Sequence, residues 1–342
     1  MPGNRVIQGR KDMNIKMIAA ASALAMMAGA AGAETVLRAS TFLPPNHTWN
    51  HAIEEWGAEL TEKSGGELRV EIYPAGQLGP PPRQFDLVTS GAAEMAVILH
   101  GATPGRFAMT ELAGLPLVTP SSGNTSEIMS RRLTELAPDY LAEEHPGTKI
   151  LWMAVTPPLK FHLADTDPSD LSALDGLRIR YAGSVWQQVI EAMGASPVPV
   201  PPAEAADAMS KGVVDGATFP YEATQSFDLA PVTNYSMEPG IASATFALVM
   251  SQSAYDGLSP EQQAIIDETT GPDRAEWYGA KWDEGEAAGR QYMVDGGVEI
   301  VTLEDAQLDE LRSQYQPIVD SAVEAVAGRG MPAQEFVDAY TQ

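Results

Sequence analysis

The chain of 342 residues contains no cysteine. This absence excludes disulfide bridges, thiol catalysis and zinc sites built on thiolates, so the folded chain must be stabilised by burial of a core. Basic residues are also scarce, because 21 Lys and Arg stand against 46 Asp and Glu, a formal net charge of −25. Such a surface repels nucleic-acid phosphates and anionic lipids, so the composition disfavours both as partners.

Long apolar runs are absent after the first 33 residues. Within them, two lysines precede an apolar stretch at 17–30, and small residues follow it up to Ala33. This order is typical of a cleavable secretory signal peptide, and the stretch is too short to span a bilayer. We expect export with cleavage after Ala33, and translation from Met1 or Met13. Residues 1–33 hold four basic residues and one acidic residue, so their removal takes the net charge to −28.

The remaining residues predict an α/β protein with more than one domain. About 300 residues exceed what one compact core usually holds. Strand patterns at 35–40, 67–73, 95–99, 149–155, 174–183, 216–219 and 244–251 alternate with helical patterns, and helices fill most of the chain after 251. No internal repeat or linker is found, so we expect the chain to cross between its domains more than once.

Two helix boundaries can be predicted in detail. Asn46 is expected to cap a helix that ends at Gly65 and Gly66. Ser259 is followed by a first-turn proline and by a Gln at the third position, which together predict a capping box at the start of a helix. The Gly-Pro pair at 271–272 should break this helix.

Motifs for metal binding and catalysis are missing. His47, His51 and Glu55 share one helical face, but the H-E-x-x-H motif is absent, which favours an amphipathic helix start. The segment 165–170 superficially resembles a calcium loop but has proline at its fourth position and no glycine at its sixth. No P-loop, G-x-G-x-x-G or G-x-S-x-G occurs. We predict no metal, no cofactor and no enzymatic activity.

Two short segments do suggest a binding site. In "LDGLRIRYAG" (174–183), alternation places Arg178 and Arg180 on one face of a strand whose sheet is normally covered on both sides. In "FPYE" (219–222), Phe219 and Tyr221 follow a strand, at the sheet edge where open α/β sheets bind ligands.

Several segments together resemble one family, the periplasmic solute-binding proteins of tripartite ATP-independent periplasmic (TRAP) transporters. They are "EIYPAGQLGPPPRQFDLVTSGAAEMAV" (71–97), "GATPGRFAMTELAGLPLV" (101–118), "LSALDGLRIRYAGSVWQQVIEAMGASPVPVPPAEAADAMSKGVVDGATFPYEA" (171–223) and "LSPEQQAIIDETTG" (258–271). The resemblance implies a periplasmic protein with two α/β domains around a ligand cleft, with crossing strands and a long C-terminal helix. It divides the chain into domain I at 34–157 plus 246–285 and domain II at 158–245 plus 286–342.

The resemblance also implies a function and a central residue. The protein would close on a small organic anion and deliver it to a small and a large TRAP membrane subunit, as a monomer or weak dimer. In the family, the last arginine of the "GLRIR" motif pairs with the ligand carboxylate, and that position here is Arg180. Arg178 is expected to face the surface. A planar guanidinium suits this task because it binds both carboxylate oxygens at once.

This sequence departs from the sialic-acid-type branch of that family. Lys160 stands where a second arginine is found, Phe219 stands where an asparagine is found, and Leu99 and Ala102 replace a glutamate and an arginine. These changes remove donors and acceptors that a polyhydroxylated ligand needs, which favours an aromatic or apolar monocarboxylate. We therefore list as candidate ligand-binding residues Arg180, Lys160, Phe219, Tyr221, Trp186, His100, Trp49 and His47.

Other functions remain open at this stage. A small dicarboxylate or keto acid could use Lys160 and Arg180 together. A secreted hydrolase or lyase could use His47, His51 or His100, although no nucleophile accompanies them. An acidic structural or adhesion protein fits the charge but not the alternating strands and helices.

Overall fold

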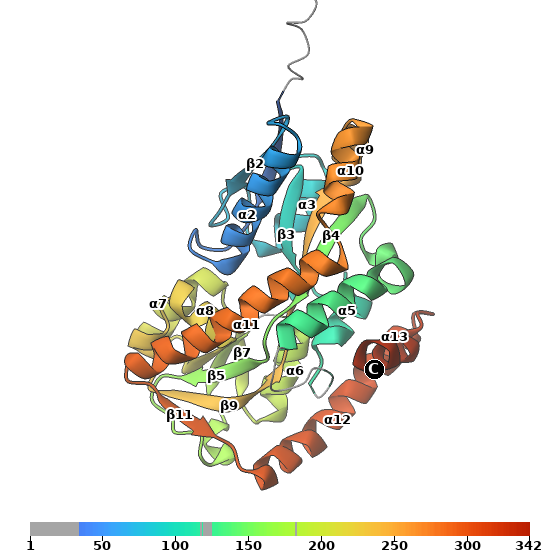
Figure 1. Ribbon diagram of the computed structural model, residues 1–342. Helices are drawn as coiled ribbons and strands as arrows, with labels where there is room; N and C mark the ends of the chain where they lie inside the picture. Colours follow the sequence, from blue (N-terminus) through green and yellow to red (C-terminus); the bar gives the residue numbers. More distant parts are fainter. Residues whose placement is uncertain (1–33, 117, 119–124, 182) are drawn as a thin grey trace, which may run out of the picture.

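The computed structural model describes residues 34–342 except 117, 119–124 and 182. The predicted signal peptide lies outside these residues. The chain forms a mixed α/β fold with two sheets, as the sequence predicts. Each sheet carries its own helices, and Figure 1 shows the two resulting lobes joined by a long helix, α11 (Pro272–Asp295).

The first sheet has five strands in the order β2-β1-β3-β10-β4. Its strands are β1 (Thr35–Ser40), β2 (Leu68–Tyr73), β3 (Met95–Leu99), β4 (Thr148–Val155) and β10 (Thr245–Ser251). The first three run parallel, whereas β10 inserts antiparallel between β3 and β4. Strands β3 and β10 are buried along their whole length, which explains the continuous apolar run of β3 and that at 246–250 within β10.

The second sheet has six strands in the order β11-β9-β5-β8-β6-β7. They are β5 (Leu159–Leu163), β6 (Arg178–Tyr181), β7 (Ser196–Pro199), β8 (Gly216–Phe219), β9 (Tyr235–Ala242) and β11 (Glu299–Thr302). Strand β6 lies between β7 and β8 and runs parallel to both. Arg180 therefore sits in the interior of a sheet rather than on its edge.

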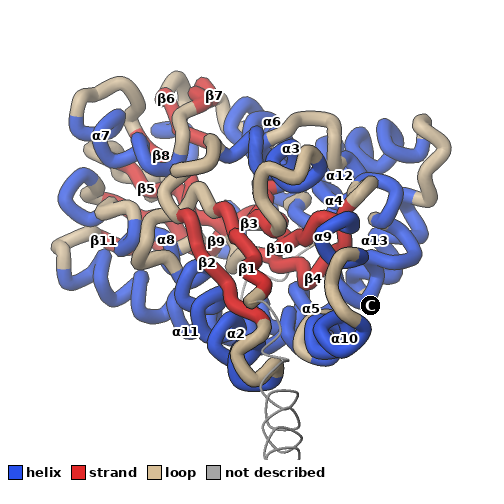
Figure 2. The backbone as a smooth tube through the Cα atoms, turned by 90° about the horizontal axis from the view of Figure 1, so that it is seen from above, coloured by secondary structure: helices blue, strands red, loops and turns tan. Residues whose placement is uncertain are grey.

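Helices surround both sheets, as Figure 2 shows from above. Besides α11 they are α2 (Thr48–Lys63), α3 (Gln84–Thr89), α4 (Ala108–Glu111), α5 (Thr125–Tyr140), α6 (Ser184–Ala192), α7 (Ala205–Ser210), α8 (Tyr221–Ser226), α9 (Gln252–Asp256), α10 (Pro260–Glu268), α12 (Asp305–Ala327) and α13 (Ala333–Thr341). The predicted capping box at Ser259 is confirmed, and α10 ends before Gly271 while α11 starts at Pro272.

The prediction that Asn46 caps α2 is wrong. The cap is His47, whose Nδ1 accepts a hydrogen bond of 3.2 Å from the backbone N–H of Trp49. Histidine is a rarer cap than asparagine, but its ring nitrogen satisfies the same free N–H group at the helix start. Asn50, inside the helix, instead donates to the carbonyl of Pro44 in the preceding turn.

The chain passes between the lobes several times, as expected. Strand β4 leads into β5 through 156–158, and β9 leads into β10 through 243–244. Helix α11 packs against both α5 and α8, and so lies along both lobes (Figure 1). The predicted domain limits stay a prediction. Helix α13 packs against α5, on the lobe of the first sheet, although the predicted limits assign it to domain II with the rest of 286–342.

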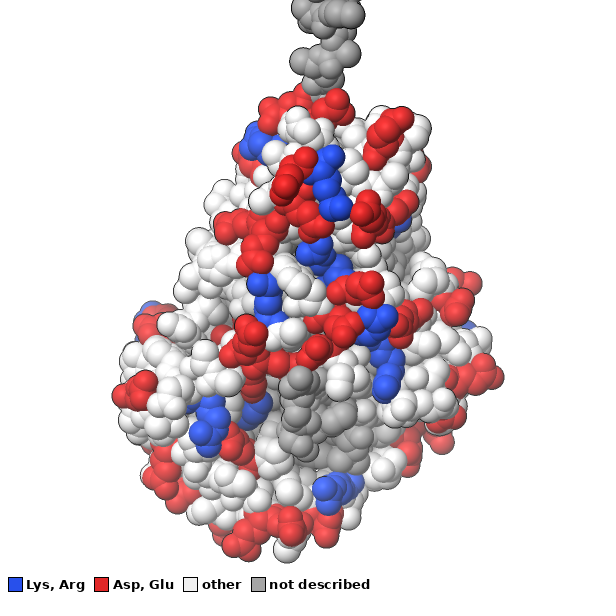
Figure 3. Space-filling view, in the orientation of Figure 1, with Lys and Arg blue, Asp and Glu red and all other residues white. Residues whose placement is uncertain are grey.

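Acidic side chains are numerous on the face of the molecule drawn in Figure 3. In Figure 3, Asp and Glu are spread over the whole face shown, with Lys and Arg interspersed. Several basic residues of the chain form surface ion pairs, such as Lys281 with Glu55 and Arg290 with Glu238. Exposed pairs of this kind contribute only about 0 to 1 kcal/mol each, so stability rests on the apolar cores of the two sheets.

Candidate functional site

A small cavity of about 50 Å³ lies where the two sheets meet. Both lobes contribute to its wall, and most of that wall is apolar. The lining residues are Phe42, Leu43, His47, Leu99, Thr156, Leu159, Arg180, Pro202, Thr218, Phe219, Pro220, Glu222, Ala223, Phe227, Ala244, Phe246 and Trp282. A concave, aromatic-lined site with a few polar groups is the usual form of a small-molecule pocket.

Arg180 is the cation of this cavity, and it is buried without a counterion. Only 1% of the residue's surface is exposed. Nε donates to the carbonyl of Val200 at 3.0 Å and Nη1 donates to that of Thr218 at 3.1 Å, which fixes the plane of the guanidinium. Among the described residues, no Asp or Glu pairs with it and no hydrogen-bond partner is found for Nη2.

The electrostatic state of Arg180 follows from this burial. Desolvation lowers its pKa to about 9, so the guanidinium is charged at neutral pH. Its Cζ lies 4.2 Å from the centroid of the Phe219 ring, a cation–π contact that partly offsets the desolvation. A guanidinium has five N–H groups, and two backbone carbonyls use only two of them. The remaining N–H groups form a fork that a carboxylate can accept from both oxygens.

Arg178 behaves differently, although it lies on the same face of β6. Its side chain is 47% exposed and pairs with Asp215, with Nη2 at 2.6 Å from Oδ1 and Nε at 3.0 Å from Oδ2. The prediction that Arg178 faces the surface is confirmed. The two arginines differ because β6 enters the cavity wall only at its second half.

His47 and Glu222 form the second polar group of the cavity, and they come from different lobes. His47 precedes α2, and Glu222 lies in the first turn of α8. The Nε2 atom of His47 is 3.8 Å from Oε2 of Glu222, and both side chains are buried. Burial lowers the pKa of His47 although Glu222 raises it, so the ring is neutral near pH 7. Because Nδ1 is the acceptor for Trp49 N–H, the proton of the neutral ring is on Nε2.

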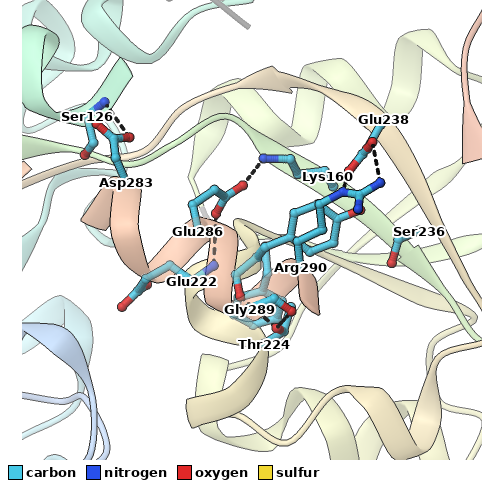
Figure 4. A network of polar contacts seen from close by, with 12 residues as sticks. Ser126, Lys160, Glu222, Thr224, Ser236, Glu238, Asp283, Glu286, Gly289 and Arg290 are labelled. Atoms are coloured by element: carbon cyan, nitrogen blue, oxygen red, sulfur yellow. Dashed lines mark hydrogen bonds and ion pairs between the residues drawn. The ribbon is translucent and has the colours of Figure 1, made fainter. Parts of the chain in front are cut away.

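Lys160 has its own partner in this region. Its Nζ pairs with Oε1 of Glu286 on α11, and Oε2 of the same carboxylate accepts from the backbone N–H of Glu222 at 2.9 Å. Figure 4 shows Glu286 between these two groups, with the Glu222 carboxylate turned away from Lys160. The ammonium also lies 5.1 Å from the centroid of the Tyr221 ring. Lys160 does not line the cavity.

The two lobes touch at a pair of glycines beside the site. Gly101 follows β3 in one lobe, and Gly183 follows β6 in the other. A Cβ atom placed on Gly101 would lie 2.7 Å from the Cα of Gly183, and Gly183 has a φ of +98° that favours glycine. The lobes are therefore in a closed arrangement, with backbone against backbone at this contact.

Three other candidate residues lie near the site or in the cores without lining the cavity. Tyr221 packs its ring 5.5 Å from that of His162. Trp49 is stacked against Trp152 in the core of the first sheet. Trp186 belongs to the core of the second sheet and borders a separate cavity of about 20 Å³. Their roles as ligand contacts stay predictions.

His100 is held in a buried pair. Its Nε2 is 3.1 Å from Nε2 of His145, its Nδ1 is 3.0 Å from the hydroxyl of Thr245, and His145 Nδ1 donates to the carbonyl of Leu141. Burial lowers the pKa of both rings, to about 4 for His145. This arrangement is a satisfied core contact, and His100 lies outside the cavity wall.

Sequence reasoning missed several residues of the cavity wall. Glu222 was part of the "FPYE" segment but was not singled out, and Phe227 follows in the next turn. Phe42, Phe246 and Trp282 come from three distant parts of the chain, and only the fold brings them together: the ring of Phe246 lies 6.4 Å from that of Phe42 and 5.4 Å from that of Trp282. Trp282 could have been suspected from its helical spacing to Tyr278.

The site offers binding chemistry. A fixed guanidinium, a histidine N–H and a carboxylate face a largely aromatic cavity, which suits an organic anion. Within the described residues, no group of three or more His, Asp or Glu has the arrangement of a metal site. In the same part of the chain, no helix combines the length and apolar character needed to cross a membrane.

Comparison with known proteins identifies the family. The family model for bacterial extracellular solute-binding proteins, family 7, matches residues 39–325. A TRAP solute-binding protein from an unidentified marine microbe, described as specific for aromatic acid ligands and solved with 3-hydroxybenzoate, is 30% identical with a TM-score of 0.86. The match covers 91% of this chain and 98% of that one.

Two further solved structures show the range of ligands among similar proteins. A TRAP solute-binding protein from Rhodoferax ferrireducens T118, solved with copurified benzoate, is 28% identical with a TM-score of 0.84, covering 90% of this chain and 96% of that one. One from Chromohalobacter salexigens, solved with D-glucuronate, is 24% identical with a TM-score of 0.78, covering 89% and 99%. The last likeness concerns the fold alone.

Proposed function

This chain belongs to family 7 of the bacterial extracellular solute-binding proteins, those of TRAP transporters, and we propose that its solute is a small aromatic or otherwise apolar monocarboxylate. Proteins of this family work outside the cytoplasm and bind small molecules for a membrane transporter. The proposal concerns which molecule is bound and which residues hold it.

The observation that carries the proposal is the uncompensated charge of Arg180. A buried cation without an anion is unfavourable, because its desolvation is not repaid by an ion pair. A ligand carboxylate that accepts from the free N–H groups of Arg180 supplies that anion. Hydrogen bonds of this charged kind contribute roughly 1.5 to 3 kcal/mol each. The carboxylate thus stabilises the closed arrangement of the lobes, and closure can report occupancy to the transporter.

The rest of the cavity wall supports an aromatic body. Phe219 stacks on the guanidinium, and its ring is 5.3 Å from that of Phe227. A flat ring packs well against such an aromatic wall, whereas several hydroxyl groups would lose their hydrogen bonds to water there. The two similar proteins of 28% and 30% identity were solved with benzoate and 3-hydroxybenzoate, which agrees with this reading.

The size of the cavity adds a condition. An engineered protein cavity of about 150 Å³ binds benzene, and the cavity here is about 50 Å³. An aromatic acid therefore needs side chains of the cavity wall, such as Phe227, to rotate. A small keto acid needs less room, so ligand size is part of the test below.

A dicarboxylate is less well supported, because the second cation is already paired. Lys160 would have to leave Glu286 to bind a second carboxylate, and that would leave a buried glutamate without its partner. Arg180 is the cation in the cavity wall that has no such partner among the described residues.

A thermal-shift panel tests the proposal. Benzoate, hydroxybenzoates, mandelate, succinate, pyruvate and glucuronate are added separately, and a bound ligand raises the melting temperature as its concentration increases. We expect aromatic acids to give the largest shifts. A strong response to glucuronate or succinate, with none to the aromatic acids, contradicts the proposal. An unchanged ligand after prolonged incubation agrees with binding without catalysis. The same protein should deliver its ligand to the small and large TRAP membrane subunits.

A further inference from the structure

We propose that His47 and Glu222 form a hydroxyl-reading pair, which selects aromatic acids carrying one hydroxyl group away from the carboxylate. This inference rests on the proposed function, because it assumes that Arg180 holds the carboxylate of the same ligand. It assigns a second polar part of the cavity wall and names the substituent that this part recognises.

The hydrogen-bonding roles of the two side chains are fixed by their surroundings. The Nδ1 of His47 is used by the N–H of Trp49, so Nε2 faces Glu222 as a donor. Glu222 is a buried carboxylate, which is an acceptor. The distance from His47 Nε2 to Glu222 Oε2 is 3.8 Å, which is too long for a direct hydrogen bond. This part of the wall is therefore one donor beside one acceptor, and neither satisfies the other.

Only some chemical groups match this arrangement. A hydroxyl donates its hydrogen to Glu222 and accepts from His47 Nε2, so it satisfies both residues at once. An ammonium group could pair with Glu222 but has no lone pair for His47. A second carboxylate has no hydrogen to donate and would meet the Glu222 charge. The pair thus favours a hydroxyl and rejects dicarboxylates.

The same pair links ligand chemistry to lobe closure. His47 belongs to the lobe of the first sheet and Glu222 to that of the second, and both side chains line the cavity that Arg180 also lines. A hydroxyl placed between them would connect the lobes by two hydrogen bonds. Glu222 is also fixed in position by α11, because its backbone N–H donates to Glu286 and its side chain packs against Gly285 of that helix.

Calorimetry with matched ligands tests the inference. The series is benzoate, the 2-, 3- and 4-hydroxybenzoates, their methoxy analogues, and isophthalate and terephthalate. We expect at least one hydroxybenzoate to bind 10-fold or more tightly than benzoate. Its methoxy analogue, which cannot donate, should lose that gain, and the benzenedicarboxylates should bind weakest. Equal affinities for benzoate and for every hydroxy and methoxy analogue would overturn the inference while leaving the proposed function intact. No binding by any aromatic acid would overturn both.

A substitution separates recognition from structure. Glu222→Gln keeps the side-chain volume, removes the charge and adds an N–H donor. It should reduce the preference for the hydroxybenzoate and raise the affinity for a benzenedicarboxylate relative to wild type. Glu54→Gln is the matched control, because Glu54 lies 3.4 Å from His51 in a similar pair that is exposed. If Glu222→Gln leaves all affinity ratios unchanged, the pair does not read the ligand. If this variant fails to fold, the ligand series on the wild-type protein still decides.

Discussion

The guanidinium of Arg180 lies over the ring of Phe219, with Cζ 4.2 Å from the ring centroid. Both residues come from neighbouring strands of the second sheet, β6 and β8, and both line the cavity between the lobes. This contact holds a charged group in an apolar wall. It explains how the guanidinium is stabilised before an anion binds, in a site whose wall is otherwise mostly aromatic and apolar.

Arg180→Lys should weaken binding of an aromatic carboxylate severely while leaving the fold intact. Lysine keeps the charge but loses the planar fork and the hydrogen bond to Val200, so we expect a loss on the order of 2 to 4 kcal/mol in binding free energy. Calorimetry measures it. Arg178→Lys is the control and should bind normally, because Arg178 is exposed. Near wild-type affinity of the Arg180 variant would remove this residue from the site.

The Lys160–Glu286 pair should be structural rather than part of ligand recognition. Lys160→Met leaves Glu286 buried without its cation, which typically costs about 3 to 5 kcal/mol of unfolding free energy. Adding Glu286→Gln should restore much of that loss, since it removes the unpaired charge. Urea unfolding measures both effects. Benzoate affinity should be similar in the double variant and the wild type, and a large drop there would show that Lys160 contacts the ligand.

Gly101→Ala should prevent full closure of the lobes. The added Cβ would lie 2.7 Å from the backbone Cα of Gly183, and a backbone atom cannot rotate away. We expect weaker ligand binding and a radius of gyration, measured by small-angle scattering, that stays larger with ligand than that of the wild type. Gly257→Ala serves as control because its Cβ would meet only ordinary contacts of 3.4 and 3.5 Å. Identical scattering of the liganded wild type and the Gly101 variant would mean that this contact does not limit closure.

Stability should fall as the pH drops below about 6.5. Burial lowers the pKa of His47, His100, His145 and His162, the last two to about 4 and about 3. In that range the unfolded chain binds more protons than the folded one, so protonation favours unfolding. Burial raises the pKa of Asp283 to about 6 and also raises that of Glu286. These two carboxyl groups bind protons more readily in the folded chain, so they oppose the effect of the four histidines.

Urea unfolding at pH 7.5 and pH 5 measures this dependence. We expect a net loss on the order of 2 kcal/mol in the free energy of unfolding at the lower pH. Asp283→Asn should make the fall steeper, because it removes one of the opposing groups. Equal stability at the two pH values would argue against four neutral buried histidines.

The alternation of apolar strands and helices predicted all five strands of the first sheet but only β6 and β8 of the second. The family was predicted from the resemblance of four segments, not from this alternation. Arg180 was predicted because its motif is local. Glu222, Phe246 and Trp282 were not, because their place in the wall depends on β10 returning to the first sheet and on α11 spanning both lobes. The capping role of His47 was also missed, since Asn46 has the better intrinsic preference. That cap fixes the donor atom of the proposed hydroxyl-reading pair.

A crystal structure of the protein with bound 3-hydroxybenzoate decides whether Arg180 holds the ligand carboxylate. We expect both carboxylate oxygens to lie about 2.8 Å from nitrogen atoms of Arg180, with the aromatic ring beside Phe219. A carboxylate bound at Lys160, or one turned away from Arg180 toward solvent, would contradict this expectation.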